Sequence, residues 1–430
     1  MKSMETRAYR FRIYPDIKRQ KEIDEKLLLA QQFYNKLLEK SISPHNQSKT
    51  KISMAQFNKF KQEIITENKD FLKLYSQTLC EIEYRLLKAC QNFFRRCKEG
   101  ARKLGFAKFR SRDRYNSITY PQDNGSFSIE KGRLRISRFS GRIQIENHRD
   151  RTGKIKTLTI KKEGGEYYAI FTTEREVEPP KPEVPVDAVG IDFGIHNFIA
   201  TSDGQRLEKP QFMRKAQKKI ALWQRRMERR TKRGKNRKLA GTQSKRREKA
   251  KEKLNEAYSR SIRQNEDYMH KLSDNLVRKS GYNLFIAEDL RIQNMMQNHH
   301  LARSIANCAW GGFRMFTEYK SHEEGKHFML VPAENSTQEC SACGNVKKGK
   351  DKLSLKDRIY DCQLCGLTLD RDVNAARVIL KRGLATFGLK GSNNAQGDET
   401  SAVHANAPKS SVWELRTDKT PPMHEGRNLP

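Results

Sequence analysis

Two Cys-x-x-Cys pairs lie close together in the C-terminal third of this 430-residue chain. Cys340 and Cys343 form the first pair, Cys362 and Cys365 form the second, and 18 residues separate them. This spacing is typical of four-cysteine zinc sites. A glycine follows each pair and permits the tight turn that directs both sulfur atoms at one ion. Because four thiolates fill a tetrahedral shell, we expect one structural zinc ion in a ribbon over residues 336–365.

Two disulfides or a redox pair would use the same residue type. The sequence shows no secretory signal, which predicts a reducing compartment where disulfides are rare. A redox site needs one pair, whereas this chain has two in zinc spacing. The remaining cysteines fall in helical patterns and are expected to be small buried residues; they are Cys80, Cys90, Cys97 and Cys308.

Two acidic residues lie in apolar segments that read as buried strands. Asp192 belongs to an alternating segment in which Val189, Ile191, Phe193 and Ile195 line one face. The other face is small, with Ala188, Gly190 and Gly194 beside Asp192, and is expected to leave room for a bulky charged ligand. Glu288 ends the apolar run over residues 282–290, on the face of Leu284 and Ile286. Because a lone buried carboxylate is costly, both acids require a partner, and we expect a metal ion.

A third acid, Asp372, lies with Asp370 where a helix is expected to begin. An ordinary N-cap would explain an isolated pair of this kind. The alternation of strands and helices, however, predicts an RNase H-like sheet in which Asp192, Glu288 and Asp372 converge. Two magnesium ions about 3.5–4 Å apart would relieve the repulsion of three carboxylates and contact both reacting oxygens of a phosphodiester. The sequence therefore predicts metal-assisted hydrolysis, and the absence of a GxxxxGK[ST] loop argues against ATP hydrolysis.

The charge of the chain indicates a polyanionic partner. Its 86 Lys and Arg outnumber 51 Asp and Glu, for a formal net charge of +35, and no 18-residue apolar run supports a membrane span. Between residues 214 and 253 there are 19 Lys or Arg against three Glu. A solvated helix face is the simpler explanation of a charge run, but this imbalance favours contact with phosphates. The candidate contacts are Arg225, Arg226, Arg229, Arg230, Arg246 and Arg247.

The periodicity of the chain divides it into domains. An alternating N-terminal strand over residues 1–16 joins the short strands of residues 104–180 in a β-barrel, and residues 17–103 form an inserted helical bundle. Residues 181–185 are a proline-rich linker. The RNase H-like domain comprises residues 186–335 and 366–384, with a basic helical hairpin over 210–280, and residues 385–430 are expected to be disordered. Within the barrel, Lys108, Phe109 and Arg110 combine cations with an aromatic ring and are candidates for nucleic-acid binding or for a charged strand edge.

Several motifs in this order resemble the TnpB proteins of insertion sequences, from residue 12 to about residue 385. They are GIDFGIHNFIATSDG, FIAEDL, AWGGF, STQECSACG, CQLCG and DRDVNAA. The resemblance implies a multidomain α/β protein with a RuvC nuclease domain, an inserted zinc ribbon, a wedge domain and a helical recognition domain. It places Asp192, Glu288 and Asp372 at the RuvC acid positions, with Asp370 and Asn374 beside the last.

The same resemblance implies a prokaryotic, cytoplasmic, nucleoid-associated and magnesium-dependent RNA-guided DNA endonuclease. Its partners would be a guide RNA, the target double-stranded DNA and the displaced single strand. Recognition of a target-adjacent motif would involve Thr119, Tyr120, Gln122 and Asn124. Three alternatives remain: an RNA-guided repressor that does not cut, a transposase that acts without RNA, and a small type V CRISPR effector.

Overall fold

The computed structural model divides the chain into two compact units. Unit 1 comprises Met1–Glu178 and Lys251–Glu256, and unit 2 comprises Pro179–Ala250 and Ala257–Pro430. The residues described are 3–48, 53–100, 105–121, 125–177, 187–194, 197–208, 211–236, 245–290, 295, 297, 310–354 and 356–391. The proline-rich linker expected over residues 181–185 lies outside them.

The first part of unit 1 is helical. It contains α1 (Ile17–Ser48), α2 (Met54–Glu67), the short 3-10 helix η1 (Lys69–Lys73) and α3 (Ser76–Lys98). A capping box fixes the start of α2, because Ser53 accepts a hydrogen bond from the Gln56 backbone and the Gln56 side chain accepts one from the Ser53 backbone. The apolar residues expected at helical spacing, among them Phe33, Phe57 and Leu86, are fully buried. The structure confirms the predicted helical segment.

An antiparallel sheet forms the rest of unit 1. Its strands are β1 (Ser3–Tyr14), β2 (Ser117–Tyr120), β3 (Phe127–Glu130), β4 (Arg133–Ile136), β5 (Arg142–Ile145), β6 (Lys154–Glu163) and β7 (Glu166–Val177). The strand order is β2-β6-β7-β1-β5-β4-β3. Because β1 pairs with both β7 and β5, the N-terminal strand joins the sheet as predicted, and the helices are inserted between β1 and β2.

The sheet of unit 1 differs from the predicted barrel in its closure. Among the described strands, β2 and β3 form the two edges and do not pair with each other. The sheet instead curls over its own core, where Phe127 of β3 packs edge-on against Phe171 of β7 at 6.1 Å between ring centroids. Side-chain packing therefore brings non-adjacent strands together without a closed ladder of backbone hydrogen bonds.

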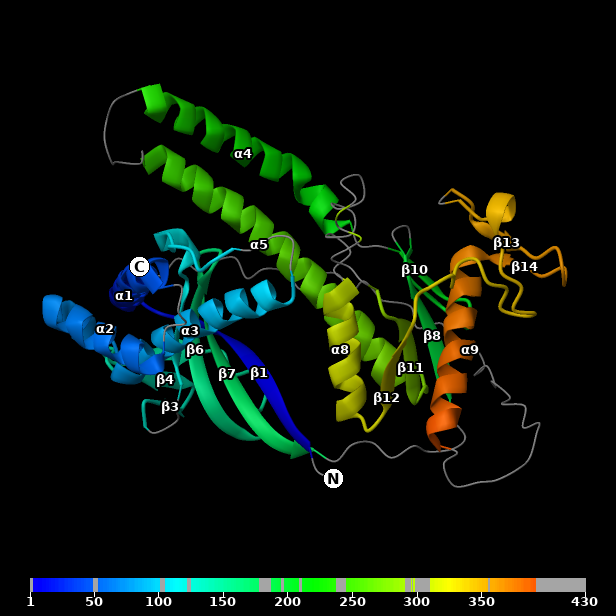
Figure 1. The fold of residues 1–430 in the computed structure, drawn as a ribbon, viewed down its shortest axis with the longest axis horizontal. Helices are drawn as coiled ribbons and strands as arrows, with labels where there is room; N and C mark the ends of the chain where they lie inside the picture. Colours follow the sequence, from blue (N-terminus) through cyan, green and yellow to red (C-terminus); the bar gives the residue numbers. More distant parts are fainter. Residues whose placement is uncertain are drawn as a thin grey trace, which may run out of the picture. The chain divides into compact units, whose positions relative to one another are not determined.

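A five-stranded mixed sheet is the centre of unit 2 (Figure 1). Its strands are β8 (Ala188–Phe193), β9 (Asn197–Thr201), β10 (Arg206–Glu208), β11 (Leu284–Glu288) and β12 (His327–Val331). The order is β10-β9-β8-β11-β12. β8 pairs antiparallel with β9, and β11 lies parallel to both β8 and β12. The strands predicted around residues 192, 288 and 330 are all present.

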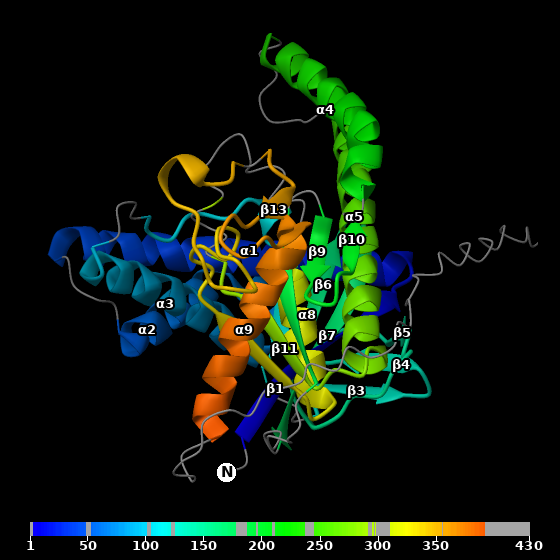
Figure 2. The same ribbon diagram turned by 90° about the vertical axis from the view of Figure 1, so that its right-hand side faces the viewer.

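Helices cover both faces of this sheet (Figures 1 and 2). Residues of α5 (Lys245–Asp274) and α8 (Trp310–Glu323) pack with Val189, Ile191 and Phe193 on one face. Residues of α9 (Arg371–Gly391) pack with Leu284 and Ile286 on the other. The prediction of which side chains share a face of the sheet is therefore correct for the described residues of β8 and β11. Ile195 lies outside the described residues. The predicted basic hairpin is formed by α4 (Phe212–Asn236) and α5, and a π-helical turn, η3 (Asn275–Lys279), follows α5.

The small face of β8 is filled by α9. A Cβ atom added to Gly190 would lie 2.1 Å from the Ala376 carbonyl oxygen and 2.8 Å from the Leu380 nitrogen. One added to Gly383 of α9 would lie 2.4 Å from Ile286 Cδ1 on β11. The expectation that Gly190 leaves room for a ligand is therefore wrong. The missing side chains instead let the helix approach the sheet closely and carry Asp372 toward Asp192.

Two predicted boundaries change. The zinc ribbon includes β13 (Ile359–Asp361), paired antiparallel with β14 (Thr368–Asp370), so it extends beyond residue 365. α9 continues to Gly391, past the expected domain end at residue 384, because Leu384 and Phe387 still pack beside β11 and β12. The remainder of the predicted tail lies outside the described residues. Within the described chain, no helix is both long and apolar enough to span a bilayer.

We predict that Gly190→Ala lowers the free energy of unfolding by about 1–3 kcal/mol or more, because the added methyl group overlaps the α9 backbone. Gly388→Ala is the matched control, since nothing lies within 4 Å of its added Cβ atom and alanine favours a helix. Urea denaturation followed by circular dichroism measures both. Equal stability of the two variants would contradict the close approach of α9 to β8.

Candidate metal centres

Asp192 and Glu288 lie side by side at one edge of the mixed sheet. β8 and β11 are parallel, and Ile191 is in register with Ala287, so the next residue of each strand is an acid. The two side chains are 4% and 5% exposed. Their carboxyl groups lie close enough for each to shift the pKa of the other. Neither carboxyl group forms an ion pair with a basic residue in the part of the chain that the structure describes.

Burial raises the pKa of both carboxyl groups. For Asp192, loss of hydration has the largest effect, and the charges of Glu288 and then Asp372 raise its pKa further. For Glu288, burial again dominates and is partly offset by the neighbouring Asp192 carboxyl group, the Phe193 backbone N–H and Ser336. Two buried carboxylates that lie side by side repel each other, so without a cation the pair favours sharing a proton. A divalent ion would replace that proton and remove the repulsion.

Asp372 lies in the first turn of α9 and acts electrostatically on Asp192. Its Oδ2 accepts a hydrogen bond of 2.9 Å from Asn197 Nδ2 at the start of β9. Within the described chain, only the four cysteines have three or more potential ligand atoms within 4.8 Å of one another. The oxygens of the three carboxylates do not all lie within this distance and do not form a compact cage around one ion. The fold therefore brings a paired Asp192 and Glu288 together with a neighbouring Asp372.

The residues that flank Asp372 have separate structural roles. Asp370 caps α9, since its Oδ1 accepts hydrogen bonds from the backbone of Asp372 at 3.0 Å and Val373 at 3.2 Å. Asp370 also pairs with Arg206 at 2.8 Å. The N-cap explanation is thus correct for Asp370. Asn374 is fully buried and does not contact Asp372 in this structure; it binds the backbone of the zinc ribbon at Glu339 and Ser341.

The four predicted zinc ligands form one cluster. The sulfur atoms of Cys340, Cys343, Cys362 and Cys365 all lie within 4.8 Å of one another. The Sγ distances are 3.6 Å for Cys340–Cys365 and for Cys343–Cys362, as expected for thiolates that share a zinc ion. Backbone N–H groups of Cys365 and Leu364 help lower the pKa of Cys362 to about 6, which favours the thiolate that binds metal. The cluster fits zinc.

Sequence reasoning missed two residues that hold the acids. Asn197 reads as an ordinary turn residue between two strands, and Ser336 precedes the first cysteine pair without a distinctive pattern. In the structure, Asn197 donates a hydrogen bond to Asp372, and the buried Ser336 hydroxyl, which donates to the Ala333 carbonyl oxygen at 3.2 Å, lies near enough to Glu288 to help lower its pKa. Short polar residues of this kind carry no spacing signal in a single sequence, so only the fold identifies them.

Comparison with known proteins gives two family matches. Residues 171–299 match the OrfB_IS605 model, described as a probable transposase, and residues 310–379 match the Cas12f1-like TNB domain. A putative RNA-guided DNA endonuclease of Streptomyces pristinaespiralis is 28% identical over 388 residues, which cover 88% of this chain and 90% of the relative. The putative RNA-guided DNA endonuclease InsQ of Escherichia coli is 28% identical, covering 73% and 75%. TnpB-like protein L79 of Acanthamoeba polyphaga mimivirus is 30% identical over 33% of this chain and 27% of its own.

The resemblance to TnpB proteins is confirmed. The two family matches contain all three acids and all four cysteines, with Asp192 and Glu288 in the first and Asp372 and the ribbon in the second. The TnpB-like part of the chain thus coincides with the centres that the fold assembles.

The basic hairpin presents several of its arginines to solvent. Arg225 and Arg229 on α4 and Arg246 on α5 are exposed, while Arg226, Arg230 and Arg247 are half-buried. Arg226 lies over the Trp223 ring at 4.6 Å. Arg230 hydrogen bonds to the Arg246 carbonyl oxygen and links the two helices. Their binding of nucleic acid remains a prediction.

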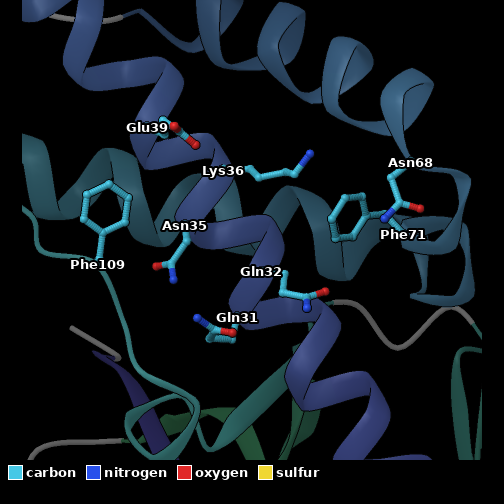
Figure 3. Close-up of a pocket in the computed structure, with 8 residues that line it drawn as sticks. All are labelled: Gln31, Gln32, Asn35, Lys36, Glu39, Asn68, Phe71 and Phe109. Atoms are coloured by element: carbon cyan, nitrogen blue, oxygen red, sulfur yellow. The ribbon is translucent and has the colours of Figure 1, made fainter. Parts of the chain in front are cut away.

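The segment with Lys108, Phe109 and Arg110 is exposed beside α1 (Figure 3). Asn35 holds this segment through two hydrogen bonds with the Arg110 backbone, of 2.8 and 2.9 Å. The Phe109 ring is 56% exposed and borders a hollow of about 380 Å³. The amides that line this hollow come from Gln31, Gln32, Asn35 and Asn68. The exposed ring and cations remain compatible with the predicted nucleic-acid contact.

The predicted contact of Tyr120 with nucleic acid is not supported. Its side chain is 1% exposed, its ring stacks on Tyr75 at 5.7 Å, and its hydroxyl donates to the Ser137 carbonyl at 3.3 Å. Burial raises its pKa, as expected for a phenol in the core. Tyr120 therefore stabilises the fold of unit 1. Gln122 and Asn124 lie outside the described residues.

We predict that Cys340→Ser removes the bound zinc and destabilises unit 2, because structural zinc sites contribute folding free energy, on the order of 10 kcal/mol in zinc-finger peptides. Elemental analysis and thermal unfolding with and without a chelator measure the two effects. Cys97→Ser, which changes an exposed thiol of α3, should retain zinc and stability. Unchanged unfolding of the wild type after chelation would contradict a structural zinc site.

The buried acid pair predicts a pH-dependent effect of Asp192→Asn. The pKa of Asp192 in the folded protein is raised above its usual value of about 4. The metal-free wild type therefore loses stability as the pH rises from this usual value to above the pKa of Asp192 in the folded protein. The variant has no carboxyl group to ionise at this position and should gain stability relative to the wild type over the same range. Thermal unfolding from about pH 5 to pH 8 without divalent ions measures this difference.

At the upper end of this pH range, added Mg²⁺ should make the wild type more stable than Asp192→Asn. Saturation at about 100 times the dissociation constant adds roughly 2.7 kcal/mol to a protein that binds the ion. A pH-independent difference between the two metal-free proteins would show that Asp192 does not titrate as its burial requires.

Proposed function

We propose that this protein is an RNA-guided DNA endonuclease that hydrolyses phosphodiester bonds with two magnesium ions in an RNase H-like domain of the RuvC type. The observation that carries this proposal is the buried pair of Asp192 and Glu288 at the ends of adjacent parallel strands, with Asp372 beside it. Three acids gather at one edge of a mixed sheet, and within the described residues the paired Asp192 and Glu288 form no ion pair with a basic side chain, which favours hard divalent cations as their ligands.

The donor set fits magnesium. All three side chains offer carboxylate oxygens, which Mg²⁺ prefers, and the paired acids are a poor arrangement without a cation. When bound, two such ions supply Lewis-acid stabilisation of the phosphodiester and a more acidic water. Asp192, Glu288 and Asp372 would hold them.

The surrounding residues prepare these acids. Glu288 accepts a hydrogen bond from the Phe193 backbone N–H at 3.4 Å, which orients its carboxylate, and the nearby Ser336 helps lower its pKa. Asn197 fixes one oxygen of Asp372 and leaves the other to a ligand. These contacts limit the movement of the acids and lower the cost of arranging them around metal.

The partners follow from charge and from the relatives. A net charge of +35 favours a polyanionic partner, and the two relatives above that align with most of this chain are both described as putative RNA-guided DNA endonucleases. Base pairing with a guide RNA would select the target, and the protein would read a short adjacent motif and contact the nucleic-acid backbone. The activity places the protein with DNA in a prokaryotic cytoplasm. The Cas12f1-like match favours a small CRISPR effector as the second candidate.

We predict that Glu288→Ala lowers the rate of target cleavage by about 1,000-fold or more, because metal-held charge stabilisation contributes several kcal/mol and each 1.36 kcal/mol is tenfold in rate. RNA-dependent target binding should persist. The measurement is plasmid cleavage and target binding by the protein purified with its own RNA, in magnesium.

Asp289→Ala provides the control. Asp289 is the adjacent acid, is largely exposed and pairs with Arg314 at 3.1 Å, so its loss should leave cleavage within a few-fold of wild type. Near-normal cleavage by the Glu288 variant would refute the site, and RNA-dependent binding without cleavage by the wild type would favour a repressor.

A further inference from the structure

A cationic loop packs against the aromatic core of unit 1. It joins β5 to β6 over residues 146–153 and carries Arg149 and Arg151. The Arg149 guanidinium lies over Tyr9 at 5.3 Å and over Phe11 at 5.9 Å. The Arg151 guanidinium lies over Phe11 at 5.5 Å and over Phe171 at 4.8 Å. Two like charges thus share the ring of Phe11.

The backbone of this loop is fixed beside the strands. The Tyr9 hydroxyl and Thr152 Oγ1 are 2.6 Å apart, and the Thr152 backbone N–H donates to the Tyr9 hydroxyl at 3.3 Å. Gly153 has a φ of +88°, and a Cβ atom there would lie 2.6 Å from the Glu174 carbonyl oxygen. The loop backbone is therefore anchored to β1 and β7 directly after Arg151.

The two arginines lack the acidic partners that neighbouring arginines have. On the same sheet, Arg10 pairs with Glu163, Arg142 with Glu130 and Arg175 with Glu5. Arg149 and Arg151 form no ion pair within the described residues. The Nη1 atom of Arg151 is shielded from solvent and has no hydrogen-bond acceptor there. Asp150, between them, is exposed and forms no ion pair with either.

This arrangement is suited to an anion. A guanidinium N–H group that is shielded from water without an acceptor is costly, and stacking on aromatic rings does not supply that acceptor. Each guanidinium group matches the oxygens of a phosphate, to which arginine can donate two parallel hydrogen bonds. Arg149 is exposed, so a ligand can approach from solvent.

We propose that Arg149 and Arg151 bind a phosphodiester group of a nucleic-acid backbone. This proposal rests on the proposed function in one respect, because it takes nucleic acid as the partner. It involves neither the metal centres nor the basic hairpin. The phosphodiester belongs to either the guide RNA or the target DNA, and the two share the same chemistry at this site. The contact carries no base specificity and adds an attachment point in unit 1.

The salt dependence of binding tests this site. The zinc-loaded, full-length protein is titrated with a single-stranded RNA and, separately, with a duplex DNA, at several KCl concentrations. The double variant Arg149→Gln/Arg151→Gln should reduce the slope of log affinity against log salt by about 1.4 for single-stranded RNA or about 1.8 for duplex DNA, if each arginine neutralises one phosphate. The probe whose slope falls identifies the strand that the loop contacts.

Three further variants distinguish binding from folding. Arg142→Gln removes an arginine that Glu130 already neutralises and should leave both slopes unchanged. Arg149→Lys/Arg151→Lys retains the charge and should keep most of the wild-type slope. If the double glutamine variant does not fold, the single variant Arg149→Gln at the exposed position should still lower one slope by about 0.7–0.9.

Wild-type slopes for both probes in the folded glutamine variants would overturn the proposal and leave the arginines a packing role. Metal-dependent cleavage would then still support the proposed function. Loss of all nucleic-acid binding by the wild-type protein would instead contradict the proposed function itself.

Discussion

The burial of two adjacent carboxyl groups is the constraint on which the centre of unit 2 depends. Asp192 and Glu288 end adjacent parallel strands, where the sheet places them together and the surrounding helices exclude water. A folded protein tolerates such a pair only when a proton or a cation is shared between the two groups. The neighbouring residues are arranged accordingly: the Phe193 backbone donates to Glu288, and Asn197 donates to Asp372.

The zinc ribbon is connected to the same acids through α9. Asn374, two residues after Asp372, hydrogen bonds to the backbone on both sides of Cys340. Arg382, farther along α9, pairs with Glu339 and donates to the carbonyl oxygens of Pro332 and Glu334. Because these contacts bind α9 to the ribbon and to the segment that precedes it, the fold of the ribbon also helps to fix the position of Asp372 at the start of α9.

Sequence patterns predicted two kinds of feature. The first is the helices and strands that bury apolar residues, and the second is the side chains whose spacing along the chain is distinctive. The four cysteines, the strands of Asp192 and Glu288, and the insertion of helices between β1 and β2 follow from such patterns. The role of Gly190 does not follow from such a pattern. A missing side chain indicates either space for a ligand or close packing, and only the position of α9 decides between them. Tyr120 was misassigned for a similar reason, since an aromatic residue at a strand end serves equally as a core residue or a contact. Asn197 and Ser336 carry no periodic signal.

The most direct test of this account is a crystal structure of the protein soaked with Mn²⁺, with anomalous scattering used to locate the ions. We expect two manganese peaks between Asp192, Glu288 and Asp372, with the carboxyl groups of Asp192 and Glu288 both bonded to metal. Manganese bound only elsewhere, with no peak beside these two carboxyl groups, would contradict the claim that these acids form a metal site.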